Sequence, residues 1–375
     1  MNGTPTLVTG ASGFIGGWVS EQLHLGGAMV RAGVRNWSNA ARIARFPFEI
    51  VSCDVLDPGS LAKAVAGVDH VVHCAVGDAK VIITGTRNVL EAASNAGVRR
   101  VIFLSSAEVY GAHTAGVIDE SAELAGGNPY ADAKAAAESI CREYSNKLEI
   151  VVLRPSIVYG PYGGAWTEDM ARRLLSGSWG SFGELGNGYC NLVYVTDLVR
   201  AIHLSLLTPA AAGRTFNITG PDDITWNEYF ELFANAIGAR TAQPRSGAAV
   251  RLEAALTSLA RKPAIYVAGQ LKAPLQELAK RSPLVRRSLR GAKEGLNNRA
   301  GREELESLYS RRARYPAALA GELLEWEPRV TVEEGLLLVR EWLIHSGVLA
   351  TPTVGVKVNR QETRQAPLPG QAVER

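Results

Sequence analysis

The stretch Thr9-Gly10-Ala11-Ser12-Gly13-Phe14-Ile15-Gly16 follows an apolar run at residues 6–8 and opens an amphipathic stretch at residues 14–25. A strand that turns through closely spaced glycines into a helix lets a ligand approach the backbone, and the helix N–H groups then face that ligand. This pattern suits a pyrophosphate. We therefore expect a dinucleotide at this turn, bound by Gly10, Ser12, Gly13, Phe14, Ile15 and Gly16.

Short β-branched runs alternate with helical patterns through the first 155 residues. The expected strands are residues 6–8, 29–34, 50–52, 71–74, 101–104 and 150–153, and the expected helices are residues 14–25, 60–65, 81–96 and 129–145. Strands that alternate with helices form a parallel sheet covered on both faces. The sequence thus predicts an α/β fold, a Rossmann-type doubly wound parallel sheet, with residues 1–155 as the dinucleotide-binding domain.

The regular alternation breaks after Arg154-Pro155. A strand at residues 192–195, a helix at 198–207, a strand at 215–218 and a helix at 226–237 restore it in part, so some later segments are expected to return to the first domain. We predict a smaller substrate-binding domain at residues 156–350. It includes a basic helical insertion at residues 245–314, and residues 351–375 are expected to form a disordered tail.

Composition narrows the class of protein. The 375 residues carry a net charge of +3, with 46% hydrophobic and 21% charged residues, which is ordinary for a globular protein and implies no nucleic-acid partner. No apolar run is long enough to span a bilayer, and no signal peptide opens the chain, so a cytoplasmic enzyme is expected. The four cysteines lack metal-ligand spacing, and no metal site is predicted.

Residues after the second, third and fourth strands are expected to meet the rest of the dinucleotide. Arg35 stands where a carboxylate would bind the ribose of NAD, and it suits the 2′-phosphate of NADP instead, which favours NADP over NAD. Asp54 and Val55 are expected at the adenine, although Asp54 can equally cap a turn. Cys74 and Ala75 let the cofactor lie close, whereas His73 is assigned no chemistry.

Tyr130 and Lys134 are spaced i and i+4 on an expected helix, so both side chains emerge on one face. A nearby ammonium lowers the pKa of a phenol, which would suit Tyr130 to exchange a proton with a substrate. Lys134 can also hold the nicotinamide ribose. Ser106 ends a buried strand where a substrate oxygen would lie, and it can donate to that oxygen. We predict these three residues as catalytic.

Several ordered motifs resemble the extended short-chain dehydrogenase/reductase family, the group that holds sugar-nucleotide epimerases and dehydratases. Besides the glycine turn and the Tyr–Lys pair, they are Leu153-Arg154-Pro155, Val158-Tyr159-Gly160-Pro161, Val193-Tyr194-Val195-Thr196-Asp197, Phe216-Asn217-Ile218 and Leu324-Glu325-Trp326-Glu327-Pro328. The resemblance implies a Ser106–Tyr130–Lys134 triad and a bound nicotinamide dinucleotide, with Pro155 beside the cofactor. It also implies a homodimer, for which residues 81–96 and 129–145 offer apolar faces.

The chain departs from that family at several places, among them Ile82, where the family often has Asn, and an unusually short connection at residues 76–80. Ala107 replaces the acid that family dehydratases use to protonate a leaving hydroxyl, so water elimination is disfavoured. Cys190-Asn191-Leu192 lacks the arginine with which many sugar-nucleotide enzymes clamp a diphosphate. Glu108 and Asn191 are weaker candidates for substrate contact, and a structural hydrogen bond is the favoured role for Glu108.

These observations leave three functions open. The first is an NAD(P)-dependent epimerase or oxidoreductase that acts on a secondary alcohol or ketone, with a nucleotide-linked sugar as the favoured small-molecule substrate. The second is an NADP-dependent ketone reductase of the dihydroflavonol-reductase or hydroxysteroid-dehydrogenase type, and the third is a dinucleotide-binding sensor or scaffold without activity. The basic segment at residues 245–314 adds a weaker hypothesis, contact with an anionic membrane surface or a protein partner.

Overall fold

A computed structural model describes residues 5–111, 113, 115–177, 179–240 and 304–350. Its centre is a parallel sheet of seven strands in the order β10-β7-β5-β4-β1-β2-β3. The strands are β1 (Thr6–Thr9), β2 (Val30–Val34), β3 (Glu49–Ser52), β4 (His70–His73), β5 (Arg100–Leu104), β7 (Glu149–Pro155) and β10 (Thr215–Ile218). The chain runs outward from β1 to β3 and then returns to β4 on the other side of β1, which is the doubly wound order that the sequence predicted.

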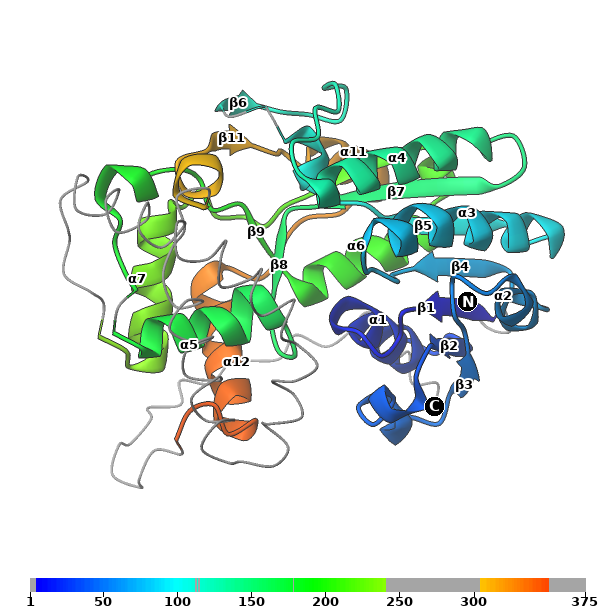
Figure 1. Cartoon of the computed structure of the whole chain (residues 1–375), viewed down its shortest axis with the longest axis horizontal. Coiled ribbons are helices and arrows are strands. Elements are labelled where there is room, and N and C mark those ends of the chain that lie inside the picture. Colours follow the sequence, from blue (N-terminus) through cyan, green and yellow to red (C-terminus); the bar gives the residue numbers. More distant parts are fainter. Residues whose placement is uncertain (1–4, 112, 114, 178, 241–303, 351–375) are drawn as a thin grey trace, which may run out of the picture.

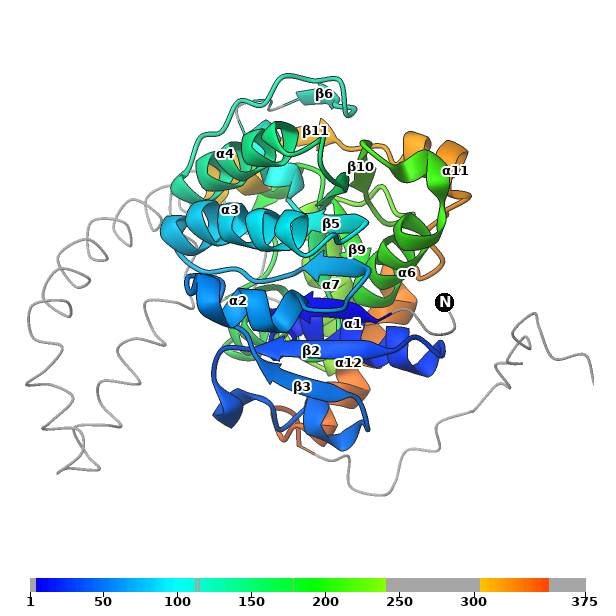
Figure 2. The ribbon, with the colours of Figure 1, turned by 90° about the vertical axis from the view of Figure 1, so that its right-hand side faces the viewer.

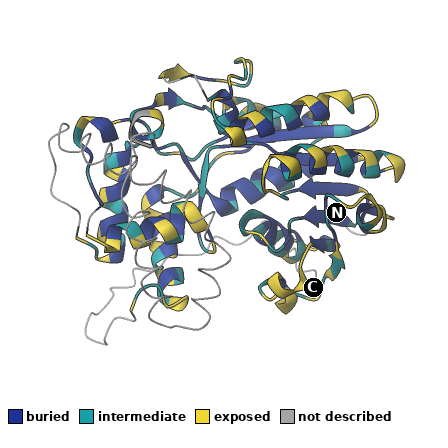
Figure 3. Cartoon of the chain, viewed as in Figure 1, coloured by how far each residue is buried: buried dark blue, intermediate teal, exposed yellow. Residues whose placement is uncertain are grey.

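Helices cover both faces of this sheet (Figures 1 and 2). One face carries α1 (Phe14–Leu25), α6 (Val195–Leu207) and α11 (Ala318–Leu324), and the other carries α2 (Pro58–Val65), α3 (Ala79–Asn95) and α4 (Pro129–Glu143). The outward faces of α3 and α4 are largely exposed, whereas the strands between the helix layers are buried (Figure 3).

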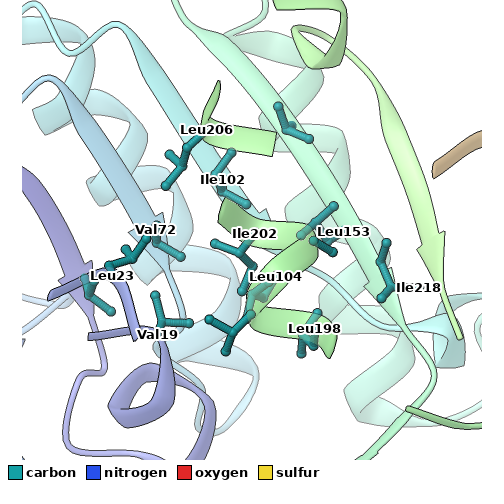
Figure 4. Packing of buried hydrophobic residues seen from close by; sticks show 14 of the residues in the cluster. Val19, Leu23, Val72, Ile102, Leu104, Leu153, Leu198, Ile202, Leu206 and Ile218 are labelled. Atoms are coloured by element: carbon teal, nitrogen blue, oxygen red, sulfur yellow. The ribbon is translucent and has the colours of Figure 1, made fainter. Parts of the chain in front are cut away.

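Alternate residues of each central strand supply the two cores. On β5, Val101 and Phe103 pack towards α3 and α4, while Ile102 and Leu104 pack towards α6. Figure 4 shows Leu198, Ile202 and Leu206 of α6 against the second of these surfaces. Because both faces of a parallel sheet are covered, its strands are apolar along their whole length. Successive side chains still alternate between the two faces, and the alternation shows in which helices each side chain contacts.

A separate aromatic core lies beyond the carboxyl ends of the strands. It is built from α5 (Asp169–Leu175), α7 (Trp226–Ile237) and α12 (Val332–His345), with short turns at Gly164–Glu168, Gly183–Gly186 and Glu304–Tyr309. Small sheets pair β8 (Ile157–Tyr159) with β9 (Leu192–Tyr194) and β6 (Ala115–Val117) with β11 (Arg312–Arg314). Short turns also lie at Trp37–Asn39, Ile43–Arg45, Ala107–Tyr110 and Pro209–Ala211.

The expected strands and helices of the first 240 residues are present, and the structure adds the short strands β6 and β8. The prediction that helical structure runs on to residue 314 is wrong at its end, because residues 312–314 form strand β11 and pair with β6. Most of the basic insertion (residues 241–303) and the expected tail (residues 351–375) lie outside the described residues. Within the described part, no helix is long and apolar enough to cross a membrane.

Candidate active site

The site lies where strands β1 and β4 end side by side. Thr9 is in register with His73 of β4 and with Gly33 of β2. The chain leaves this point in opposite directions along the sheet, so the loops after β1 and β4 diverge and open a crevice between them. Ligands of open α/β sheets bind in such a crevice.

The glycine turn after β1 fits a dinucleotide pyrophosphate. Gly10 has a φ of +68°, and a Cβ there would stand 2.8 Å from the backbone of Ala75. A Cβ on Gly16 would overlap the carbonyl oxygen of Gly10. Gly13 begins α1 without a side-chain cap, and Ser12 beside it is half-buried. The turn is therefore closed to side chains and presents helix N–H groups, as an anion requires.

The residues expected at the adenosine end lie after β2 and β3. Arg35 is exposed directly beyond Val34, the last residue of β2. Asp54 Oδ1 accepts a hydrogen bond of 2.9 Å from the backbone N–H of Leu56. Asp54 therefore caps a turn, which was the alternative to contact with the adenine. Val55 is buried and would be struck by a Cβ on Gly85.

At the end of β4, Cys74 and Ala75 are half-buried beside the glycine turn. Burial raises the pKa of the Cys74 thiol to about 12, so the thiol is neutral. His73 is packed under the turn between the hydroxyls of Thr9 (2.7 Å) and Thr86 (3.2 Å), and burial lowers its pKa to about 3. His73 is thus a neutral packed residue, as expected. Pro155 lies buried at the end of β7.

Ser106, Tyr130 and Lys134 meet at the end of β5. Asn128 caps α4 by accepting from the backbone N–H groups of Tyr130 (3.0 Å) and Ala131 (2.9 Å), which fixes the first turn of that helix. Tyr130 is 40% exposed, and the side chain of Ser106 lies close enough to its phenol to influence its pKa. Lys134 is buried one turn further along, with its Nζ 5.9 Å from the centre of the Tyr130 ring.

The expected lowering of the Tyr130 pKa by Lys134 is not found. Burial raises the pKa of the phenol, and the carboxylate of Glu108 adds to the rise, while the hydrogen bond from Ser106 opposes it. Lys134 donates to the carbonyl of Leu104 at 2.6 Å, and burial lowers its own pKa to about 8. The prediction failed because it counted the charge of the ammonium and not the burial of both groups.

Glu108 and Asn191 both make structural contacts. Glu108 Oε1 accepts from Asn128 Nδ2 at 3.1 Å, and its Oε2 lies 3.4 Å from Arg311 Nη1. Asn191 Nδ2 donates to the carbonyl of Ala313 at 3.0 Å. The preferred structural role of Glu108 is therefore present, and its carboxylate still faces the region of Tyr130.

Glu108 and Asn191 both bind a segment that the sequence analysis did not place at the site. Residues 309–315, here called the strap, run from the aromatic core to η3 (Ala107–Tyr110) and β6, at the top of Figure 1. Tyr309 is fully buried, stacked on Phe182 and 4.7 Å from the ring of Trp226. Backbone N–H groups of Gly188 and Tyr189 donate to the strap carbonyls of Tyr309 and Arg311.

The strap also changes how two arginines of the basic segment are interpreted. Arg311 is only 9% exposed and bonds Ser307, Tyr315 and Glu108. Arg314 donates to the hydroxyl of Tyr189 at 2.7 Å and lies 3.3 Å from Asp223. Arg311 is therefore not part of a free basic face for a membrane or a partner, because it is buried and bonded within the molecule, whereas Arg314 is paired but still half-exposed. The other arginines of that hypothesis, except exposed Arg312, lie outside the described residues.

A second unforeseen contact joins the loop after β8 to the glycine turn. Tyr162 has a φ of +69°, rare for a residue with a side chain, and the guanidinium of Arg42 stacks 3.7 Å from its ring. Trp18 of α1 donates to the carbonyl of Pro161 at 2.9 Å. A Cβ on Gly163 would stand 3.2 Å from Phe14. These contacts join the loop after β8 to the start of α1 and to Arg42.

The sequence and the fold of the chain are both similar to those of known enzymes. The family model described as "NAD dependent epimerase/dehydratase family" matches residues 6–219. An N-acetyl-α-D-glucosaminyl-diphospho-ditrans,octacis-undecaprenol 4-epimerase of Escherichia coli O157:H7 is 29% identical over 59% of this chain and 69% of its own. Cinnamoyl-CoA reductase 1 of Oryza sativa subsp. japonica is 34% identical over 57% and 71%. A dTDP-glucose 4,6-dehydratase structure from Streptomyces venezuelae, with NAD bound, covers 92% of this chain and 99% of its own at 23% identity and a TM-score of 0.68.

Proposed function

Because the chain belongs to the NAD-dependent epimerase/dehydratase family, we propose that it epimerises or oxidises a secondary alcohol of a nucleotide-linked sugar, with a nicotinamide dinucleotide as cofactor. The observation that carries the proposal is that Ser106, at the end of β5, lies close enough to Tyr130 of α4 to influence its pKa, at the same carboxyl edge of the sheet as the glycine turn. Relatives that act on nucleotide sugars support the substrate class.

In this proposal each residue of the site has one role. The cofactor, when bound, supplies a hydride acceptor and donor. Tyr130 takes the proton from the substrate hydroxyl during oxidation and returns it during reduction. Ser106 donates a hydrogen bond to the same substrate oxygen, which holds that oxygen at the phenol. Lys134 holds the ribose hydroxyls of the cofactor, and the glycine turn around Gly10 and Gly16 receives the pyrophosphate.

Hydride return by this site is tested with UDP-glucose that carries deuterium at C4. Since one carbon loses and regains the same hydrogen, the epimerised product should keep the deuterium at C4 and take up none from solvent. Tyr130→Phe should lower the rate by about 10²- to 10⁴-fold while NADH still binds. Unchanged turnover in Tyr130→Phe, or no turnover of UDP-linked and dTDP-linked sugars by the natural enzyme, would contradict the proposal.

A second candidate is an NADP-dependent ketone reductase. Arg35 is exposed directly after β2, at the position where a carboxylate would bind the ribose of NAD, and its guanidinium favours the 2′-phosphate of NADP. Two cinnamoyl-CoA reductases, 34% and 31% identical to this chain, support this candidate. Arg35→Asp should then weaken NADPH binding far more than NADH binding. Equal affinities of the natural enzyme for both cofactors would count against this candidate.

Three broader features complete the proposal. Residues 1–155, with β10 and α6, form the dinucleotide-binding domain, and the aromatic core within residues 156–350 forms the substrate-binding domain. The apolar residues of α3 and α4 that were expected to offer a homodimer contact pack on the sheet instead, so the proposed homodimer would form through the exposed outward faces of these two helices, which pack side by side (Figure 3). The enzyme acts in the cytoplasm.

A further inference from the structure

A buried ion pair lies one helical turn beyond Lys134. Glu138 of α4 and Arg154 of β7 have side chains that are 2% and 5% exposed. Arg154 binds the carboxylate with two nitrogens, Nη2 to Oε2 at 2.7 Å and Nε to Oε1 at 3.0 Å. This two-point geometry fixes the orientation of both side chains, and removal of either partner would leave an unpaired charge in the interior.

The carboxylate of Glu138 is also bonded to the strand that carries Ser106. Ser105 donates to Glu138 Oε1 at 2.5 Å, and its neighbour Leu104 accepts from Lys134 at 2.6 Å. Two successive turns of α4 therefore bond to two successive residues at the end of β5. The next residue along the chain is Ser106, whose side chain lies close enough to Tyr130 to influence the pKa of its phenol.

Arg154 extends the same network to two more elements. Its Nη1 donates to the hydroxyl of Tyr110 at 2.7 Å, and that hydroxyl donates to Asn217 Oδ1 at 2.8 Å. Asn217 in turn donates to the carbonyl of Ile118 at 3.2 Å. The ends of β5, β7 and β10, together with η3, are thus tied to one carboxylate on α4.

We propose that Glu138, held by Arg154, is a positioning residue that sets α4 against the end of β5 and so places Lys134 and Tyr130 relative to Ser106. The inference deepens the proposed function and rests on the roles given there to these three residues. Glu138 touches neither substrate nor cofactor, because Ser105, Arg154 and the packing of α4 enclose it.

The chain offers a matched control in a second Arg–Glu pair between β5 and β7. Arg100 binds Glu149 at 2.7 Å at the opposite, amino-terminal end of the same two strands. Glu149→Gln thus disturbs an ion pair of the same sheet far from Ser106. Glu138→Gln keeps the size of the side chain and removes only its charge.

The test measures the affinity of the full-length protein for two probes, NADH and ADP. ADP carries the adenosine and the pyrophosphate and lacks the nicotinamide ribose, so it probes the glycine turn without Lys134. In Glu138→Gln, the Kd for NADH should rise about tenfold while the Kd for ADP stays within about twofold. Glu149→Gln should leave both Kd values within about twofold of the natural protein. A merely structural role of Glu138 would move both probes together.

Ser105→Ala is a second, milder test that remains available if Glu138→Gln does not fold, because it removes one hydrogen bond and adds no bulk. We expect it to weaken NADH binding about threefold and to spare ADP binding. The inference is overturned if both variants bind NADH as the natural protein does, or if they lose both probes in equal proportion. If the difference between the probes appears but no nucleotide sugar is turned over, the proposed substrate is wrong and the positioning role stands.

Discussion

Gly16 lies in the first turn of α1, and its missing side chain leaves space that the carbonyl of Gly10 occupies. A methyl group there must push the helix away from the turn, since backbone atoms cannot move aside as a flexible side chain can. The geometry of the pyrophosphate site therefore depends on this single residue. The sequence predicted a glycine requirement here from spacing alone, and the overlap gives its physical cause.

Gly16→Ala is expected to abolish measurable dinucleotide binding and to lower the free energy of unfolding by about 1–3 kcal/mol, the usual cost of overpacking. Isothermal titration with NADH and urea denaturation measure the two effects. Gly164→Ala is the control, because a Cβ at Gly164 meets no atom within 4 Å. Retention of NADH affinity in Gly16→Ala would show that the turn is not the phosphate site.

Single residues also mark the limit of sequence reasoning. The i, i+4 spacing of Tyr130 and Lys134 correctly placed both on one helix beside Ser106. The direction of the Tyr130 pKa was wrong, because it depends on burial and on Glu108, which is 22 positions away in the sequence. Spacing tells which side chains share a face, whereas burial depends on the packing of the whole domain.

Among the elements, the strap is the feature that local sequence patterns miss. Its strand β11 pairs with β6, about 200 residues earlier in the chain, and Arg311 reaches Glu108 over a separation of 203 residues. No periodicity signals such a contact, and the run Arg311-Arg312-Ala313-Arg314 reads as part of a basic stretch. The strands and helices of the sheet were predictable, because the strands are short apolar runs, the helices carry an apolar period, and Gly26, Gly67 and Gly97 follow α1, α2 and α3.

The strap is anchored at its start by the ring of Tyr309 in the aromatic core. Tyr309→Ala should lower the free energy of unfolding by about 3–5 kcal/mol, because it removes a fully buried ring. Tyr309→Phe keeps the ring and should cost about 1 kcal/mol. Urea denaturation, followed by tryptophan fluorescence, measures both. Equal losses in the two variants would assign the anchoring to the hydroxyl and not to the ring.

At the scale of the whole molecule, the buried Lys134 makes stability depend on pH. Its pKa falls from 10.5 to about 8 on folding, so below pH 8 both states are charged and the folded state carries the full cost of burying that charge. Between these values the unfolded state binds more protons, and the free energy of unfolding rises with pH. Lys134→Met removes this contribution.

The stability advantage of Lys134→Met over the natural protein should therefore shrink by about 3 kcal/mol between pH 7 and pH 10.5. Urea unfolding at several pH values measures this difference. Lys63→Met, at an exposed position of α2, controls for the loss of a surface charge. An advantage that stays constant with pH would mean that Lys134 is not buried as a charged group.

The central claim is that the molecule binds a nicotinamide dinucleotide at the glycine turn and uses it for hydride transfer with a nucleotide sugar. The most direct test denatures the purified protein, identifies any released nucleotide by mass spectrometry, and assays UDP-glucose epimerisation with no cofactor added. The account predicts released NAD in near-equal amount to protein and epimerisation without added cofactor. A protein that releases no nucleotide, and that only consumes NADPH with apolar ketones, would contradict the claim.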